Sequence, residues 1–72
     1  MSFDLEMLGE RIRQLRLKKG YSLEKMGKAM GLHYTAITKW ETGKNGPTLD
    51  NLYELAKFFN VSSDYLLGIT DY

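Results

Sequence analysis

The chain has 72 residues, 43% of them hydrophobic, a length that suits one small domain rather than two. It contains no cysteine and a single histidine, His33, which excludes disulfides, thiolate metal sites, cysteine nucleophiles and a multi-histidine metal site. No apolar run approaches the roughly 18 residues of a membrane span and no signal peptide opens the chain, so we expect a soluble, cytoplasmic protein.

The formal net charge of +1 conceals a strongly basic centre. Residues 11–44 carry nine lysines and arginines against Glu24 and Glu41, a net charge of +7, whereas the segments on either side carry −3 each. Such a stretch indicates an anionic partner, either nucleic acid or an acidic protein, or else a solvated helix face.

The first predicted helix lies between Asp4, which can cap its start, and Gly20, which can adopt the left-handed conformation beyond its end. Its apolar residues recur at three- and four-residue steps and therefore share one face. They are Leu5, Leu8, Ile12 and Leu15. The second helix is expected from about Leu23 to Met30, with Ser22 as its N-cap and Gly31 as its stop.

The third predicted helix runs from about Tyr34 to Thr42 and stops at Gly43, with Ile37 and Trp40 directed inward. The fourth begins after Thr48 and ends at Asn60, which tolerates left-handed backbone. Its apolar residues are expected on one side of the helix. They are Leu49, Leu52, Leu55, Ala56 and Phe59.

A short fifth helix is expected from Ser62 through Leu67, closed by Gly68. Val61 is the only valine, and no segment alternates with the two-residue period of a strand. The predicted fold class is therefore all-α, with five short helices around one core and residues 1–72 as a single domain.

The second and third predicted helices are joined by a very short turn. Gly31 can supply the positive φ that such a turn needs at its start. Gly27 lies inside the second helix, where glycine costs roughly 1 kcal/mol relative to alanine. A glycine at this position is explained if the third helix crosses directly over it.

Several motifs occur in the order and spacing of one known family and cover nearly all of the chain. They are Gly9–Arg16, Lys19–Ser22, Gly27 with Gly31, Ile37–Gly43, Pro47–Leu52 and Asn60–Gly68. The chain resembles helix-turn-helix proteins of the lambda-repressor and Cro type, the xenobiotic-response-element family of bacterial and phage transcriptional regulators. The resemblance implies a helix-turn-helix at about residues 22–43. It also implies sequence-specific binding to double-stranded DNA, most simply as a dimeric repressor on an inverted repeat, without a cofactor.

In this family the third helix lies in the DNA major groove. By position, the resemblance implies base contacts from Tyr34, Thr35, Thr38 and Lys39. Lysine can donate to guanine O6 and N7, and threonine hydroxyls can pair with several base edges. The alternatives are a surface lysine at position 39 and a Tyr34 ring folded back over the turn.

The resemblance also implies phosphate contacts on either side of the third helix, from Ser22, His33, Thr42, Lys44 and Asn45. For Ser22, helix capping alone is the alternative. Leu23 departs from the family pattern, which often has glutamine there, so contact at that position must come from backbone N–H groups. His33 replaces the usual serine or threonine cap, and an imidazole near a phosphate would strengthen binding as pH falls toward about 6. The alternative for His33 is an exposed turn residue.

Arg16 and Glu41 are similar to a family pair in which an arginine of the first helix bridges a glutamate that ends the third. We therefore expect this pair to be structural. An enzyme is not expected, because the acidic residues are scattered and His33 has no partner for a catalytic triad.

The alternative function is a protein-interaction module on the same fold, either antitoxin-like or controlled by a partner. Four apolar residues, not all of which the helical pattern buries, could serve a protein contact or complete the small core. They are Leu17, Phe58, Ile69 and Tyr72. Those near the carboxyl end could also form a two-fold dimer contact.

Overall fold

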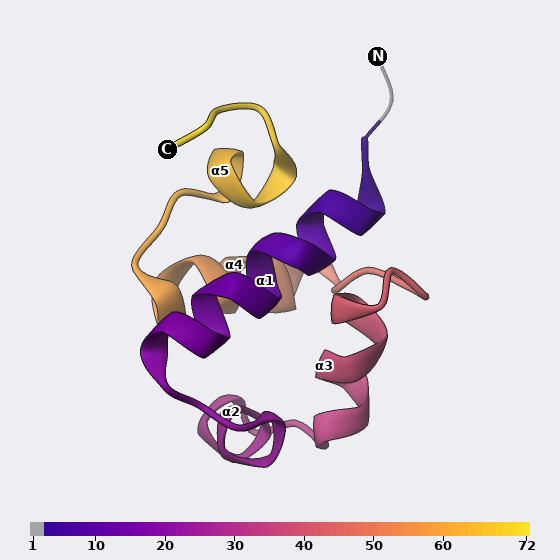
Figure 1. Cartoon of the computed structure of the whole chain (residues 1–72), viewed down its shortest axis with the longest axis vertical. Coiled ribbons are helices and arrows are strands. Elements are labelled where there is room, and N and C mark those ends of the chain that lie inside the picture. Colours follow the sequence, from indigo (N-terminus) through magenta and orange to yellow (C-terminus); the bar gives the residue numbers. More distant parts are fainter. Residues whose placement is uncertain (1–2) are drawn as a thin grey trace.

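Five helices follow one another along residues 3–72, the part of the chain that the computed structural model describes (Figure 1). They are α1 (Leu5–Lys19), α2 (Leu23–Met30), α3 (Tyr34–Glu41), α4 (Leu49–Phe59) and α5 (Ser63–Leu67). No strand occurs among these described residues. The predicted all-α class and the number and order of the helices are therefore confirmed.

Each helix begins at a residue whose side chain accepts a hydrogen bond from a backbone N–H of the first turn, which satisfies a donor that the helix itself cannot. These N-caps are Asp4, Ser22, His33, Thr48 and Ser62. Four of the helices, α1, α2, α4 and α5, end at a residue with left-handed backbone. These residues are Gly20, Gly31, Asn60 and Gly68. In α3 the left-handed residue is Gly43, one position later, and the helix ends at Glu41 rather than at the predicted Thr42.

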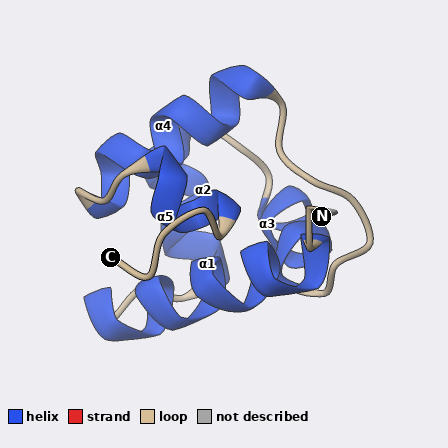
Figure 2. Cartoon of the chain, turned by 90° about the horizontal axis from the view of Figure 1, so that it is seen from above, coloured by secondary structure: helices blue, strands red, loops and turns tan. Residues whose placement is uncertain are grey.

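The core lies where α1 crosses the other helices. α1 packs against α3, α4 and α5, whereas α2 packs mainly against α3 (Figure 2). Every helix contributes at least one buried apolar side chain to this core. The buried residues are Leu8, Ile12, Met26, Ile37, Trp40, Leu55 and Leu66. Among residues 3–72, no helix is long and apolar enough to cross a membrane.

Leu49 differs from the prediction for the fourth helix. It was expected on the apolar side of α4, but its side chain is 84% exposed. Leu55 is the fully buried residue of this helix. At about 100° per residue, Leu49 lies only about 20° around the helix axis from Ala56, which packs against the core, so Leu49 is on the apolar side of α4 but at its first residue, where the core does not reach. Phe58, in contrast, is half-buried and packs against the core.

Arg11 fastens the segment after α5 to α1. Its Nη1 donates to the carbonyl oxygen of Tyr65 and, at 2.9 Å, to that of Thr70. Its Nη2 lies 3.5 Å from a carboxylate oxygen of Asp71, and the guanidinium carbon lies 4.3 Å from the Tyr65 ring centroid. One basic residue of the central stretch is thus used to hold the end of the fold.

Candidate nucleic-acid interface

The turn between α2 and α3 is built around two glycines. Gly31 has φ +72°, which only a residue without a side chain adopts at little cost. A Cβ on Gly27 would lie 2.7 Å from the carbonyl oxygen of Leu32 and 3.2 Å from the backbone nitrogen of Tyr34. The absence of a side chain at Gly27 therefore lets the turn and the start of α3 lie directly against α2, as the sequence predicts.

The other end of α3 lies against α1 through a third glycine. A Cβ on Gly9 would collide with the carbonyl oxygen of Trp40 and would lie 3.0 Å from that of Glu41. The backbones of the two helices can approach this closely because Gly9 has no side chain. This contact was not predicted individually, because spacing along the sequence does not tell which residue of α1 meets α3.

Arg16 of α1 and Glu41 of α3 form a two-point ion pair. Arg16 Nε donates to Glu41 Oε2 at 2.7 Å, and Nη2 donates to Oε1 at 3.0 Å. Nη1 also donates to the carbonyl oxygen of Tyr21 at 2.8 Å. The hydrogen bonds that Arg16 donates to Glu41, together with the negative charge of Glu41, raise the pKa of the Arg16 guanidinium, against the opposing effect of burial. The pair holds the C-terminal end of α3 in place.

The outer face of α3, which we define as Tyr34, Thr35, Thr38 and Lys39, points away from the core. At about 100° per residue, the last three of these lie within about 100° of one another around the helix. Thr35 and Lys39 are exposed, Thr38 is half-buried, and Tyr34 is 40% exposed. Ile37 and Trp40, on the opposite side, are buried, as predicted. In Figure 1 α3 lies at the edge of the molecule, beyond α1.

The N-terminal turn of α3 carries a local arrangement of three side chains. The backbone N–H of Thr35 donates to Nδ1 of His33 at 3.3 Å, and the hydroxyl oxygen of Thr35 lies 2.9 Å from the same nitrogen. The imidazole stacks on the ring of Tyr34, with 4.7 Å between the ring centroids and 28° between the planes. His33 is thus a helix cap, and its contact with phosphate stays a prediction.

The remaining candidate phosphate contacts differ in which atoms they can offer. Ser22 Oγ accepts from the backbone N–H of Lys25 at 3.0 Å, which leaves its hydroxyl hydrogen free to donate. Thr42 instead donates its hydroxyl hydrogen to the carbonyl oxygen of Thr38 at 2.9 Å. The backbone N–H groups of Lys44 and Asn45 both donate to the carbonyl oxygen of Lys39. For these last two residues, only the exposed side chains are available to a partner.

The basic residues of the central stretch are not all available to a partner. Arg11 and Arg16 are held by the contacts described above. The Nζ atom of Lys19 lies 5.0 Å from the ring centroid of Phe58, and that of Lys25 lies 4.5 Å from the ring centroid of Tyr21. Lys39 and Lys44, on α3 and in the loop beyond it, are exposed. Lys19 and Lys25 are exposed as well, so it is Arg11 and Arg16, bound within the fold, by which the charge counted from the sequence overstates the cations that the interface can use.

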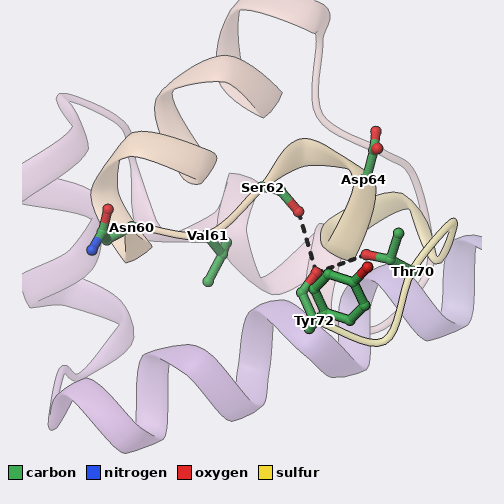
Figure 3. Close-up of a pocket in the computed structure, with 6 residues that line it drawn as sticks. All are labelled: Asn60, Val61, Ser62, Asp64, Thr70 and Tyr72. Carbon is green, nitrogen blue, oxygen red and sulfur yellow. Dashed lines mark hydrogen bonds between the residues drawn. The ribbon is translucent and has the colours of Figure 1, made fainter.

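A surface pocket lies elsewhere, along the segment that follows α4 (Figure 3). Its lining residues are Asn60, Val61, Ser62, Asp64, Thr70 and Tyr72. The hydroxyls of Ser62 and Thr70 both donate to the main-chain oxygen of Tyr72, at 3.4 and 2.7 Å. None of the lining residues belongs to α2 or α3. Within the described part of the chain, no three His, Asp or Glu side chains are grouped so that they could hold a metal ion.

A helix-turn-helix family model matches residues 12–66, a stretch that includes α2, α3 and α4 completely. The chain belongs to this helix-turn-helix family. Among its relatives, the HTH-type transcriptional activator BcrR of Enterococcus faecalis is 40% identical over 59 residues, which are 82% of this chain and 29% of BcrR. The chain thus spans less than a third of that regulator.

Solved structures of the family share the arrangement of the helices. The P22 c2 repressor, in complex with the synthetic operator 9T, is 39% identical with a TM-score of 0.80, over 85% of this chain and 92% of that one. The restriction-modification controller protein C.AhdI from Aeromonas hydrophila is 32% identical with a TM-score of 0.78. The match covers 88% of this chain and 96% of that one. The whole repressor protein C2 of Salmonella phage P22 is longer, and the match spans 29% of it.

Proposed function

We propose that this helix-turn-helix chain binds double-stranded DNA sequence-specifically as a transcriptional regulator, with α3 in the major groove. The outer face of α3 is the observation that carries the proposal. It presents hydroxyl groups, an aromatic ring and an ammonium group on a helix that is anchored from behind by Gly9 and by the Arg16–Glu41 pair. A rigid helix with exposed hydrogen-bonding side chains is what base readout requires.

The solved relative that is bound to its synthetic operator supports this proposal. By analogy with such a complex, the outer face of α3 contacts base edges. The residues at the two ends of that helix and at the start of α2 contact phosphates, which position the protein without reading sequence. These phosphate-contacting residues are Ser22, His33, Thr42, Lys44 and Asn45.

We further propose that the regulator is a repressor that acts as a homodimer on an inverted repeat. Two recognition helices related by two-fold symmetry reach successive major grooves about 34 Å apart, which corresponds to half-sites about 10 base pairs apart. In this proposal residues 1–72 act as one domain with the helix-turn-helix at about 22–43. Binding needs no cofactor and involves no catalysis, and it takes place in the cytoplasm, where a bacterial or phage genome lies.

A protein-interaction module is the second candidate function. It is favoured by three of the apolar side chains that the core leaves uncovered: Leu17, Ile69 and Tyr72 are 49%, 68% and 90% exposed. Such residues can contact a protein partner or a second copy of the chain. In this reading the basic stretch meets an acidic protein, and DNA binding is secondary or absent.

The deciding experiment is selection from a random double-stranded DNA library with the purified chain at moderate salt. An enriched inverted repeat supports the dimeric DNA-binding regulator, and a single enriched half-site supports DNA reading by a monomer. If the chain is folded by circular dichroism and no sequence is enriched, the proposed function is wrong and the protein-interaction module is favoured.

A further inference from the structure

The hydroxyl of Thr35 lies in the middle of the outer face of α3, and His33 determines how its hydrogen is used. His33 Nδ1 lies 2.9 Å from Thr35 Oγ1 and 3.3 Å from the backbone nitrogen of Thr35. Stacking on Tyr34 holds the plane of the imidazole while it makes both contacts. A single ring nitrogen is therefore shared by one backbone group and one side chain of the same residue.

The two contacts together assign the hydrogens. A backbone N–H can only donate, so Nδ1 must accept and carries no hydrogen of its own. With Nδ1 an acceptor, the Thr35 hydroxyl must be the donor in the 2.9 Å contact. The hydroxyl hydrogen is then used within the protein, and only the two lone pairs of Thr35 Oγ1 remain for a partner.

We infer that Thr35 reads DNA as a hydrogen-bond acceptor and that its target is an exocyclic amino group. In the major groove the donors on base edges are adenine N6 and cytosine N4, whereas guanine O6 and N7 and thymine O4 accept. His33 is therefore a positioning residue that decides which class of base edge Thr35 selects. The inference rests on the proposed function, because it requires the outer face of α3 to lie in the major groove.

The experiment uses duplexes that carry the enriched site, with single functional groups removed from the base pair that faces Thr35. That base pair is identified as the position of the site at which the wild-type chain prefers one base and the Thr35→Val variant does not. One duplex lacks the exocyclic amino group, with purine in place of adenine or 2-pyrimidinone in place of cytosine. A second duplex has a 7-deaza purine, which removes the N7 acceptor. Dissociation constants are measured by fluorescence anisotropy and compared with that of the unmodified duplex.

We expect removal of the amino group to weaken binding of the wild-type chain by roughly three- to tenfold, and removal of N7 to have little effect. The Thr35→Val variant should bind all three duplexes alike. Dependence on N7 without dependence on the amino group would overturn the assigned hydrogen-bond direction. A Thr35→Val variant with unchanged preference at every position would show that Thr35 reads no base.

The role of His33 is tested with His33→Gly, because glycine is tolerated at an N-cap with only a small loss of stability. Without the imidazole, the Thr35 hydroxyl can donate as well as accept, so it can turn to an acceptor on the same base pair when the amino group is missing, and dependence on the amino group should fall below that of the wild-type chain. The matched control is Ser22→Gly at the N-cap of α2, which should weaken all duplexes equally. A His33→Gly variant that keeps the full amino-group dependence would contradict the role of His33. Absence of any selected site would contradict the proposed function itself, which is a separate outcome.

Discussion

Arg16 and Glu41 meet through two parallel hydrogen bonds, at 2.7 and 3.0 Å, and both side chains are at least 90% buried. The pair connects the C-terminal half of α1 to the last residue of α3. Since Arg16 also donates to the carbonyl oxygen of Tyr21, one guanidinium links α1, the loop before α2 and α3. The orientation of the candidate recognition helix thus depends on a contact that is remote from its outer face.

Replacement of Glu41 by Gln should destabilise the fold by about 3–5 kcal/mol, because it leaves the Arg16 charge buried without its counter-charge. Urea unfolding followed by circular dichroism measures the effect. The exposed Glu54→Gln variant is the control and should stay within about 0.5 kcal/mol of wild type. The double variant Arg16→Met/Glu41→Leu should be more stable than either single variant. A loss below about 1 kcal/mol in Glu41→Gln would contradict the structural role of the pair.

The raised pKa of Arg16 also predicts how the pair responds to pH. A cationic group whose pKa is higher in the folded state stabilises the fold fully below its unfolded pKa, and this stabilisation is lost only as pH rises through the folded pKa. For an arginine, both the unfolded and the folded pKa lie far above the pH range in which the protein is studied. The difference in stability between wild type and Glu41→Gln should therefore be the same at pH 7 and at pH 10. A difference that shrinks over this range would show that another group titrates.

Gly9→Ala should destabilise the chain, although alanine normally stabilises a helix interior by up to about 1 kcal/mol relative to glycine. The reason is the collision of the new Cβ with the carbonyl oxygen of Trp40, for which α3 would have to shift. We expect a net loss of about 1–3 kcal/mol in thermal or urea unfolding. The sign of the change in the free energy of unfolding tests the contact. A stabilised Gly9→Ala variant would mean that α1 and α3 do not meet at this glycine.

Lys39→Ala and Lys44→Ala should weaken DNA binding in different ways. If Lys39 contacts a base edge, its removal weakens binding to the selected site by about 1–3 kcal/mol and relaxes the preference at one position. If Lys44 contacts a phosphate, its removal weakens binding to all sequences alike and lowers the slope of log K against log salt by about 1. Anisotropy titrations on selected and random duplexes separate the two cases. Lys57→Ala, on α4, is the control for loss of a lysine outside the proposed interface. Equal losses on both duplexes for Lys39→Ala would limit Lys39 to phosphate contact.

Ile69→Ser tests whether exposed apolar residues near the carboxyl end form the dimer. Because the side chain is 68% exposed, the free energy of unfolding should change by no more than about 0.5 kcal/mol. Affinity for the inverted repeat should fall by roughly tenfold, while affinity for an isolated half-site stays unchanged. Leu49→Ser, at an 84% exposed position on α4, is the matched control. Unchanged binding of the repeat by Ile69→Ser would remove Ile69 from the dimer contact.

The sequence by itself determined where the helices begin and end, to within one residue at the end of α3, and which side of α3 faces outward. Caps and stops such as Ser22 and Gly31 act within a few residues along the chain, so residue type and spacing are sufficient to predict them. The same holds for the outer face of α3, because Ile37 and Trp40 mark its inner side at helical spacing.

Only the tertiary structure decided which residues meet across helices, apart from Gly27 beneath the start of α3 and the Arg16–Glu41 pair that the family resemblance implied. Gly9 could be assigned to Trp40, and Arg11 to the carbonyls of Tyr65 and Thr70, only once the position of each helix against α1 was known. The exposure of Leu49 was mispredicted because apolar spacing identifies a helix face, but not how far the core extends along the helix. Such contacts join residues far apart in sequence, and their partners are set by the packing of whole helices rather than by local preference.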